Sequence, residues 1–199
     1  MRRKHCLTYI SGCTILSSVL HRKLFHERSC TVENEHFRGN YLLRVTTEKR
    51  DGRTYERVYL RSGVAVIPIT EEGNIRFVRE HHWGYNEMRT KLVTGYIEDG
   101  ESPQEAARRE LQEELGLTAE HWTLFVRSEK NDAVHKVQQY FIARGLREGP
   151  TSPQGGERIE GSIDLDFEEV FERTLRGEFG TTGTAFALLK LVVSRMMRK

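Results

Sequence analysis

Acidic side chains gather in one stretch of this chain, the segment Gly95 to Leu117, which has the sequence GYIEDGESPQEAARRELQEELGL. Glu110 and Glu114 are four residues apart, so a helix would place both on one face, one turn apart, with Glu113 beside them. Carboxylates at such short separations repel one another unless a cation lies among them. Hard divalent cations prefer oxygen ligands. The spacing therefore predicts a metal-binding helix, and a metal ion held in this way points to phosphate chemistry.

The same segment carries the signals for where this helix begins and ends. Ser102 is a preferred N-cap, Pro103 suits the first helical position, and Glu105 completes a capping box with Ser102. Gly116 supplies the stop. We therefore expect a helix from Pro103 to Leu115 that buries one apolar face and offers its carboxylates at the edge of a cleft. A surface helix with ordinary charge pairs is the alternative for the glutamates taken alone.

Strand-like segments surround this helix. Asp51-Gly52 is a strong hairpin signal between two of them, and residues 63–70 are apolar almost throughout, as in a buried central strand. The expected strands are 41–49, 54–60, 63–70, 75–80, 90–94, 122–127, 136–143 and 162–166. Further helices are expected at 167–176 and 184–198, and a loop at 145–161. Strands flanked by segregated helices predict an α+β layered domain.

Length and charge exclude several classes of protein. A chain of 199 residues fits one domain with room for a small appendage. Residues 1–26 hold five basic residues and no acid, which leaves an excess of three acids in the remainder and argues against nucleic-acid binding. The odd number of cysteines argues against a disulfide scaffold, so a cytoplasmic location is expected. No apolar run approaches the ~20 residues that span a bilayer.

The N-terminal segment is expected to lie outside the folded domain. Its basic start and mildly apolar stretch resemble a targeting signal, but the apolar part before Cys13 is short and no small-residue cleavage site ends the longer stretch. An unstructured extension, or a start codon assigned too early, is the interpretation that we favour. The expected division is an extension over residues 1–26 and one domain over residues 27–199.

The acidic segment also matches a known signature at every fixed position. Those positions are Gly95, Glu101, Arg109-Glu110-Leu111, Glu113-Glu114 and Gly116-Leu117. The pattern resembles the signature of the Nudix hydrolases, and a chance match in a chain of this length has a probability of roughly one in ten million. From about Glu27 onward the chain also resembles the ADP-ribose pyrophosphatase branch. The resemblance implies a Nudix-type α/β/α sandwich with a mixed central sheet and an N-terminal β-hairpin extension.

The resemblance also implies roles for the signature residues. The metal ligands that it implies, for Mg²⁺ or Mn²⁺, are Glu110, Glu113, Glu114 and the backbone carbonyl of Thr94. Glu110 and Glu114 are the primary ligands, and Glu113 contributes directly or through water. Arg109 is expected to pair with Glu101, so that it orients the helix and its loop and does not touch the substrate. Gly95 would let the backbone turn closely past the metal.

The general base has three candidates. In the resembled branch a glutamate from a late mobile loop activates the water, and Glu157 and Glu160 in the sequence GGERIEG stand in that region. Glu113 is the competing candidate. The sequence leaves the choice among them open.

Substrate contacts are expected just before the acidic segment. Arg79 and His82 could contact a phosphate or a ribose, and Trp83 or Tyr85 could stack on a base. The chain departs from the branch in this region, since it has Lys91-Leu92-Val93-Thr94 where many members have an acid followed by Leu-Pro-Ala. It also lacks the usual proline about fifteen residues beyond the signature, which leaves the substrate open.

The expected function is Mg²⁺-dependent hydrolysis of a nucleoside diphosphate derivative, with ADP-ribose giving AMP and ribose 5-phosphate as the first choice. The alternatives are NADH, dinucleotide polyphosphates or nucleoside sugars as substrates. A non-catalytic domain that senses a nucleotide is a further alternative, although such domains generally lose signature carboxylates and this chain keeps them all. A homodimer is expected from the resembled branch, with the hairpin free to exchange between protomers.

Overall fold

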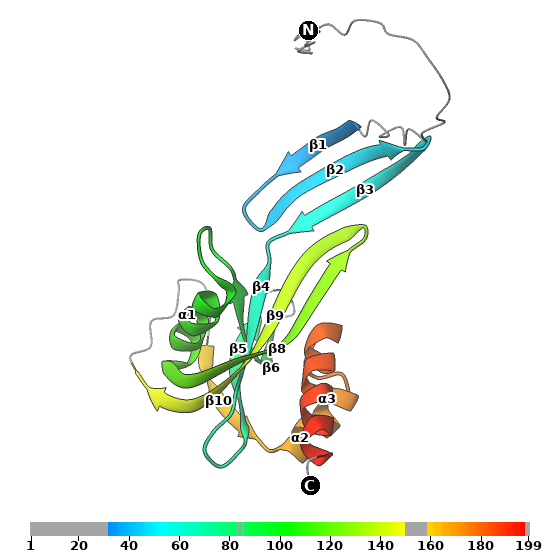
Figure 1. Cartoon of the computed structure of the whole chain (residues 1–199). Coiled ribbons are helices and arrows are strands. Elements are labelled where there is room, and N and C mark those ends of the chain that lie inside the picture. Colours follow the sequence, from blue (N-terminus) through cyan, green and yellow to red (C-terminus); the bar gives the residue numbers. More distant parts are fainter. Residues whose placement is uncertain (1–31, 83, 85, 150–158, 198–199) are drawn as a thin grey trace, which may run out of the picture. The chain divides into compact units, whose positions relative to one another are not determined.

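The computed structural model describes residues 32–82, 84, 86–149 and 159–197. Over these residues the chain forms, in order, β1 (Val32–Arg38), β2 (Leu42–Arg50), β3 (Arg53–Leu60), β4 (Gly63–Pro68), β5 (Ile75–His82), β6 (Glu87–Lys91), β7 (Val93–Tyr96), α1 (Pro103–Leu115), β8 (Leu117–Asn131), β9 (Val134–Glu148), β10 (Ile159–Leu165), α2 (Phe167–Leu175) and α3 (Thr182–Met196) (Figure 1). The expected extension over residues 1–26 lies outside this range, so that division of the chain stays a prediction.

The described strands form two sheets. The larger sheet has the order β1-β2-β3-β9-β4-β7, with β8 also paired to β9. It is mixed, because β9 runs parallel to β3 and β4 while the other pairs are antiparallel. The smaller sheet is antiparallel, with the order β10-β5-β6. The predicted mixed sheet is therefore confirmed, and a second, smaller sheet is added to it.

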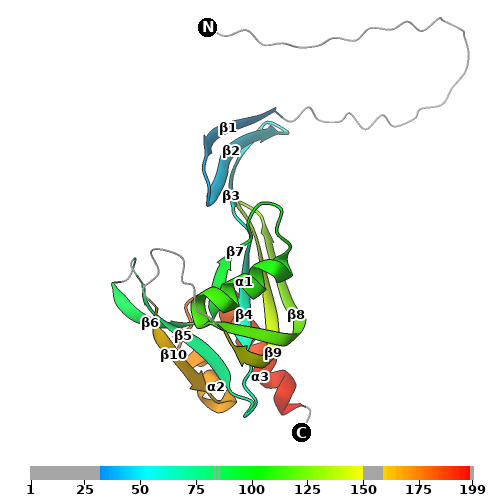
Figure 2. The same ribbon diagram turned by 90° about the vertical axis from the view of Figure 1, so that its left-hand side faces the viewer.

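Strand β4 shows how the helices cover both faces of the larger sheet. Its six residues are all buried, and alternate side chains belong to different core clusters. Val64 and Val66 pack in the cluster of α1, whereas Ala65 and Ile67 pack in the cluster of α2 and α3. Figure 2 looks onto the face that α1 covers, and Figure 1 shows α1 and α3 on opposite sides of β4 and β9. The α/β/α sandwich expected from the sequence is confirmed.

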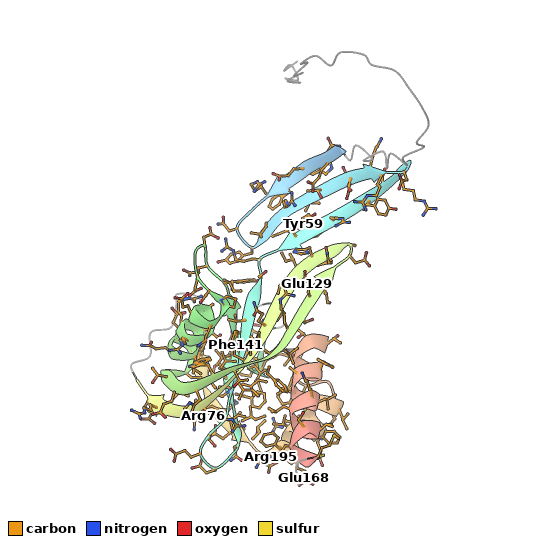
Figure 3. The ribbon with its side chains drawn as sticks, viewed as in Figure 1. Tyr59, Arg76, Glu129, Phe141, Glu168 and Arg195 are labelled. Carbon is orange, nitrogen blue, oxygen red and sulfur yellow. The ribbon has the colours of Figure 1, made fainter. Side chains whose placement is uncertain are left out.

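The same alternation continues in β9. Phe141, labelled in Figure 3, is buried on the α1 side, where the edge of Trp122 meets its ring. Tyr140 and Ile142 face the α2 and α3 side. Strands buried on both faces read as apolar runs, which is why the sequence indicates them well. The core therefore holds α1 against β4 and β7, where the acidic segment begins.

Three local predictions were wrong. Strand β1 was missed because its described side chains are largely exposed, so it carries no apolar period. Residues 90–94 are not one strand, because the chain leaves the smaller sheet after Lys91 and joins the larger sheet at Val93. The loop expected from Gly145 begins later, because Gly145 has a φ of 64° inside β9 and the strand still pairs with β8 at Glu148.

The remaining expected elements are present, although β8 (Leu117–Asn131) extends well beyond the expected 122–127. The predicted hairpin turn at Asp51-Gly52 is confirmed, with both residues at positive φ. The expected N-terminal β-hairpin extension has three strands in place of two, because β1 pairs with β2. Among the described residues, no helix is long and apolar enough to cross a membrane.

Candidate active site

Helix α1 begins and ends at the residues that the sequence predicts. The Ser102 hydroxyl accepts a hydrogen bond from the Glu105 backbone N–H at 3.3 Å, and the Glu105 carboxylate accepts one from the Ser102 N–H at 2.8 Å. Gly116 closes the helix at a φ of 64°. On the apolar face of α1, Ala106, Ala107 and Leu111 are fully buried. Caps and apolar face together fix the rotation of α1, so its acidic edge meets the end of β7.

A cleft of about 700 Å³ lies along this acidic edge. It is formed by the β1–β2 turn, the β3–β4 connection, β7 with the loop after it, and α1. The residues that line it are Asn40, Tyr41, Arg61, Thr94, Gly95, Tyr96, Glu98, Asp99, Arg109, Glu110 and Glu113. Four of the predicted site residues, Thr94, Arg109, Glu110 and Glu113, are therefore brought together in one concave surface.

Arg109 is the centre of a hydrogen-bond network in this cleft. Its Nε and Nη2 donate to the two oxygens of Glu101 at 2.9 and 3.0 Å. Its Nη1 donates to Glu110 at 2.7 Å and to Glu113 at 3.0 Å, and Nη2 also reaches the Tyr96 carbonyl at 2.9 Å. The bonds to Glu101, despite the opposing effect of burial, hold the pKa of Arg109 above its ordinary value. The guanidinium is thus a permanent positive charge between two signature carboxylates.

Glu114 faces a second cation, on the side of the smaller sheet. Lys91 Nζ lies 3.1 Å from Glu114 Oε1 and 2.7 Å from Glu80 Oε2. The backbone N–H of Thr94 also donates to Glu114 Oε1, at 3.4 Å. Burial would lower the pKa of Lys91, but the attraction of Glu114 and the hydrogen bond to Glu80 outweigh it, so the pKa is raised. Lys91 is therefore charged where it meets Glu114.

Gly95 leaves the space that the Glu110 carboxylate occupies. A Cβ atom built on Gly95 would lie 1.8 Å from Glu110 Oε1 and 1.9 Å from its Cδ, closer than any real contact. The backbone of β7 and the carboxylate are thus in close approach, as they must be if both are to contribute oxygens to one ion. Only glycine permits this approach without moving the side chain.

The oxygen atoms of Glu110, Glu113, Glu114 and Thr94 suit a hard divalent cation, although the three carboxylates do not point to one common position. Among the described residues, no group of three His, Cys, Asp or Glu side chains is arranged to hold a metal ion. Arg109 contacts both Glu110 and Glu113, and Lys91 contacts Glu114, so each of the three carboxylates faces a positive charge. Carboxylate and carbonyl oxygens are nevertheless the ligands that Mg²⁺ takes. Glu110 and Glu114 are only 8% and 3% exposed, and acidic residues are rarely buried this far unless they are paired.

The Gly95→Ala variant is expected to lose activity while keeping its fold. The added methyl group forces the flexible Glu110 carboxylate away, and this displacement disturbs the acidic edge more than it disturbs the core. We expect kcat/KM to fall at least about tenfold, which corresponds to about 1.4 kcal/mol of transition-state stabilisation. Gly149→Ala is the matched control, because its Cβ would come no closer than 3.6 Å to the Gly116 carbonyl. Equal activity of the two variants would contradict the close approach.

The remaining predicted site residues lie apart from this cleft. Arg79 is exposed and shares a strand face with Phe77, which packs in the core cluster of α2 and α3. His82 lies on the opposite face of β5, the one that Glu80 presents towards Lys91, and its Nδ1 accepts from the Gly84 N–H at 3.2 Å. Neither lines the cleft, and their contact with substrate stays a prediction.

The candidate bases separate in the same way. Glu113 lines the cleft, whereas Glu160 is exposed on β10, where the register with β5 shifts. Glu157, Trp83 and Tyr85 lie outside the described residues. The general base therefore stays open among Glu113 in the cleft and the two later candidates, Glu157 and Glu160.

Sequence reasoning missed the residues on the far wall of the cleft. Arg61 Nε donates to the Asn40 carbonyl at 2.9 Å, and its Nη1 reaches the Ile97 carbonyl and the Asp99 carboxylate, both at 3.1 Å. Beside it the rings of Tyr41 and Tyr96 lie 5.0 Å apart, although both residues are exposed. No local pattern in the sequence indicates this wall, because Tyr41 and Tyr96 are 55 positions apart in the chain.

The chain is similar in sequence and in fold to several known proteins. A family model described as "NUDIX domain" matches residues 59–179, more than half of the chain. The methanol dehydrogenase activator of Bacillus methanolicus is 28% identical over 160 residues, which cover 77% of this chain and 81% of that protein. The ADP-ribose pyrophosphatase of Mycobacterium tuberculosis is 30% identical over 128 residues, which cover 63% of this chain and 62% of that protein, less than two thirds of its length. A crystal structure of an ADP compounds hydrolase has the same fold, with a TM-score of 0.68, 20% identity and coverage of 84% of this chain and 92% of that one.

Proposed function

This chain belongs to the NUDIX family of pyrophosphohydrolases, and on that premise we propose that it hydrolyses the P–O–P bridge of a nucleoside diphosphate derivative, with ADP-ribose as the first candidate. The observation that carries this proposal is the acidic edge of α1, where Glu110 and Glu113 line a cleft beside Arg109. The relative from Mycobacterium tuberculosis is an ADP-ribose pyrophosphatase, which supports ADP-ribose as the substrate.

The chemistry follows from the charge of the substrate. A pyrophosphate linkage is anionic and repels an approaching water molecule or hydroxide. A divalent ion such as Mg²⁺ or Mn²⁺, when bound, would neutralise that charge and lower the pKa of the attacking water. Glu110 and Glu114 would hold it, with Glu113 and the Thr94 carbonyl as further oxygens. The water oxygen bonds to one phosphorus, the bridging P–O bond breaks, and two monophosphates leave, AMP and ribose 5-phosphate from ADP-ribose.

Each part of the protein has a separate task in this scheme. Arg109 holds Glu110 and Glu113 in place and ties α1 to the loop through Glu101, so its role is to position the ligands. One glutamate accepts the proton of the attacking water, and the candidates are Glu113, Glu157 and Glu160. The Tyr41 and Tyr96 rings offer an apolar surface beside the phosphate region, on which a nucleobase could stack.

Turnover of defined nucleotides tests the proposal. We expect ADP-ribose with Mg²⁺ to yield equimolar AMP and ribose 5-phosphate, resolved by ion-exchange chromatography, and EDTA to abolish the reaction. Hydrolysis in ¹⁸O-labelled water should place the label in one product only, which identifies the phosphorus that is attacked. Ranking ADP-ribose, NADH, dinucleotide polyphosphates and nucleoside sugars by kcat/KM assigns the substrate. The absence of turnover on all four classes with metal present would overturn the proposed activity.

A second candidate function is regulation of another protein. The relative from Bacillus methanolicus is named as an activator of a dehydrogenase, and it aligns with a larger share of this chain than the pyrophosphatase does. In that case the domain would sense a nucleotide without consuming it. Binding of ADP-ribose without release of either product would favour this function over hydrolysis.

Two further expectations from the sequence stay predictions, namely the homodimer and the cytoplasmic location. Among the described residues β1 is an edge strand of the larger sheet, along which a second copy could pair. Sedimentation equilibrium of the full chain measures the first expectation, and the distribution of the tagged chain in cell fractions measures the second.

A further inference from the structure

Lys91 joins two acidic residues that belong to different parts of the fold. Glu80 lies on β5 in the smaller sheet, and Glu114 lies in the last turn of α1. The Lys91 ammonium lies 2.7 Å from one carboxylate and 3.1 Å from the other. Lys91 reaches both because β6 ends at this residue and the chain then crosses to β7 in the larger sheet. A positive charge is thus built into the seam between the two sheets and the signature helix.

The surroundings make this charge strong. The side chains of Glu114, Glu80 and Lys91 are 0%, 13% and 24% exposed. Water screens such contacts much less than it screens contacts on the surface. A charge held this close to a carboxylate stabilises that carboxylate, and it repels any other cation that approaches the same oxygens. Glu114 Oε1 is the atom concerned, because Lys91 and the Thr94 N–H both contact it.

From this arrangement we propose that Lys91 is a resident counter-ion of the metal site. It holds the Glu114 carboxylate in place before a metal ion binds, and it lowers the affinity of the site for divalent cations. Lys91 is thus a positioning residue that sets the metal concentration at which the protein becomes active. The inference rests on the proposed function only in taking Glu114 as a metal ligand.

Neutralising Lys91 should tighten metal binding. In the Lys91→Met variant the negative charge of Glu114 and Glu80 is no longer compensated, so the dissociation constant for Mn²⁺ should fall by about tenfold or more. The same variant should be less stable without metal, because two largely buried carboxylates lose their ion pair with Lys91. Its melting temperature should therefore rise more steeply with Mn²⁺ than that of the wild type. Lys91→Arg keeps the charge and should keep the wild-type affinity.

The test is a titration of the full chain with Mn²⁺ alone, without nucleotide, followed by the electron paramagnetic resonance signal of free Mn²⁺. The Glu114→Gln variant identifies which binding belongs to the signature site. The double variant Lys91→Met/Glu80→Gln removes one charge of each sign, so it serves if the single variant does not fold, and it should also bind Mn²⁺ more tightly than the wild type. If Lys91 had only a structural role, Lys91→Met and the double variant would both be less stable, and neither would bind Mn²⁺ more tightly than the wild type.

The outcomes separate the inference from the proposed function. Tighter binding in Lys91→Met or in the double variant, with wild-type affinity in Lys91→Arg, supports the inference. Wild-type binding that is lost in Glu114→Gln but is not tightened by removing Lys91 overturns the inference and leaves the proposed function standing. A wild-type chain that binds no Mn²⁺ through Glu114 overturns the assignment of the metal ligand, and the inference with it.

Discussion

The Glu114→Gln variant should lose at least about a hundredfold in kcat and remain folded. Removing one ligand of an ion that neutralises the phosphates costs several kcal/mol of transition-state stabilisation, and each 1.36 kcal/mol is about tenfold in rate. The amide oxygen of glutamine can still accept the hydrogen bonds that Lys91 Nζ and the Thr94 N–H now donate. Lys91 also keeps its pair with Glu80. The free energy of unfolding should therefore fall by no more than about 2 kcal/mol.

Glu105→Gln is the matched control for this variant. Glu105 lies on the same helix, but its carboxylate accepts a hydrogen bond from the Ser102 N–H in the capping box, where glutamine serves as well. Steady-state kinetics at saturating Mg²⁺ and urea unfolding of both variants give the comparison. A Glu114→Gln enzyme with the wild-type rate would refute the ligand assignment, and a Glu105→Gln enzyme that is equally slow would show that the charge of α1 as a whole is responsible.

Local chemistry explains why the sequence predicts α1 so well. The capping box joins Ser102 to a residue three positions away, and Gly116 ends the helix through its own φ angle. The carboxylate spacing is likewise a property of one short helix. Fold class follows from the buried strands, because β4 is apolar on both faces and can only lie inside a covered sheet.

The contacts that the sequence did not predict join distant positions. Lys91 and Glu114 are 23 positions apart, and Arg61 and Asp99 are 38 positions apart. They meet only because the chain crosses between sheets after Lys91 and because the β3–β4 connection passes beside β7. Neither event has a local signal: Leu92 at the crossing is buried like any strand residue. The sequence therefore reveals which carboxylates are present, and the tertiary pairing reveals which cations stand beside them.

The Arg109→Lys variant should lose about tenfold to a hundredfold in kcat/KM. Lysine cannot replace arginine where the planar guanidinium contacts carboxylates on two sides. The guanidinium of Arg109 binds both oxygens of Glu101 while its Nη1 bridges Glu110 and Glu113. A lysine ammonium is a single point and cannot reach both sides of the network. The Mg²⁺ concentration for half-maximal rate should rise as well, because the carboxylates are no longer held in place. Initial rates over a Mg²⁺ series measure both effects.

Arg108→Lys is the matched control, because it makes the same charge-conserving replacement at the neighbouring position of α1. Arg108 is the preceding residue, it is exposed, and its guanidinium lies 5.6 Å from the centre of the Trp122 ring. The two variants have the same net charge and the same change in helix propensity, so any difference between them reports the contacts of Arg109. Arg108→Lys should keep the wild-type rate and Mg²⁺ dependence. If both variants lost activity equally, the loss could not be assigned to the Arg109 network, and the role of that network in catalysis would be refuted.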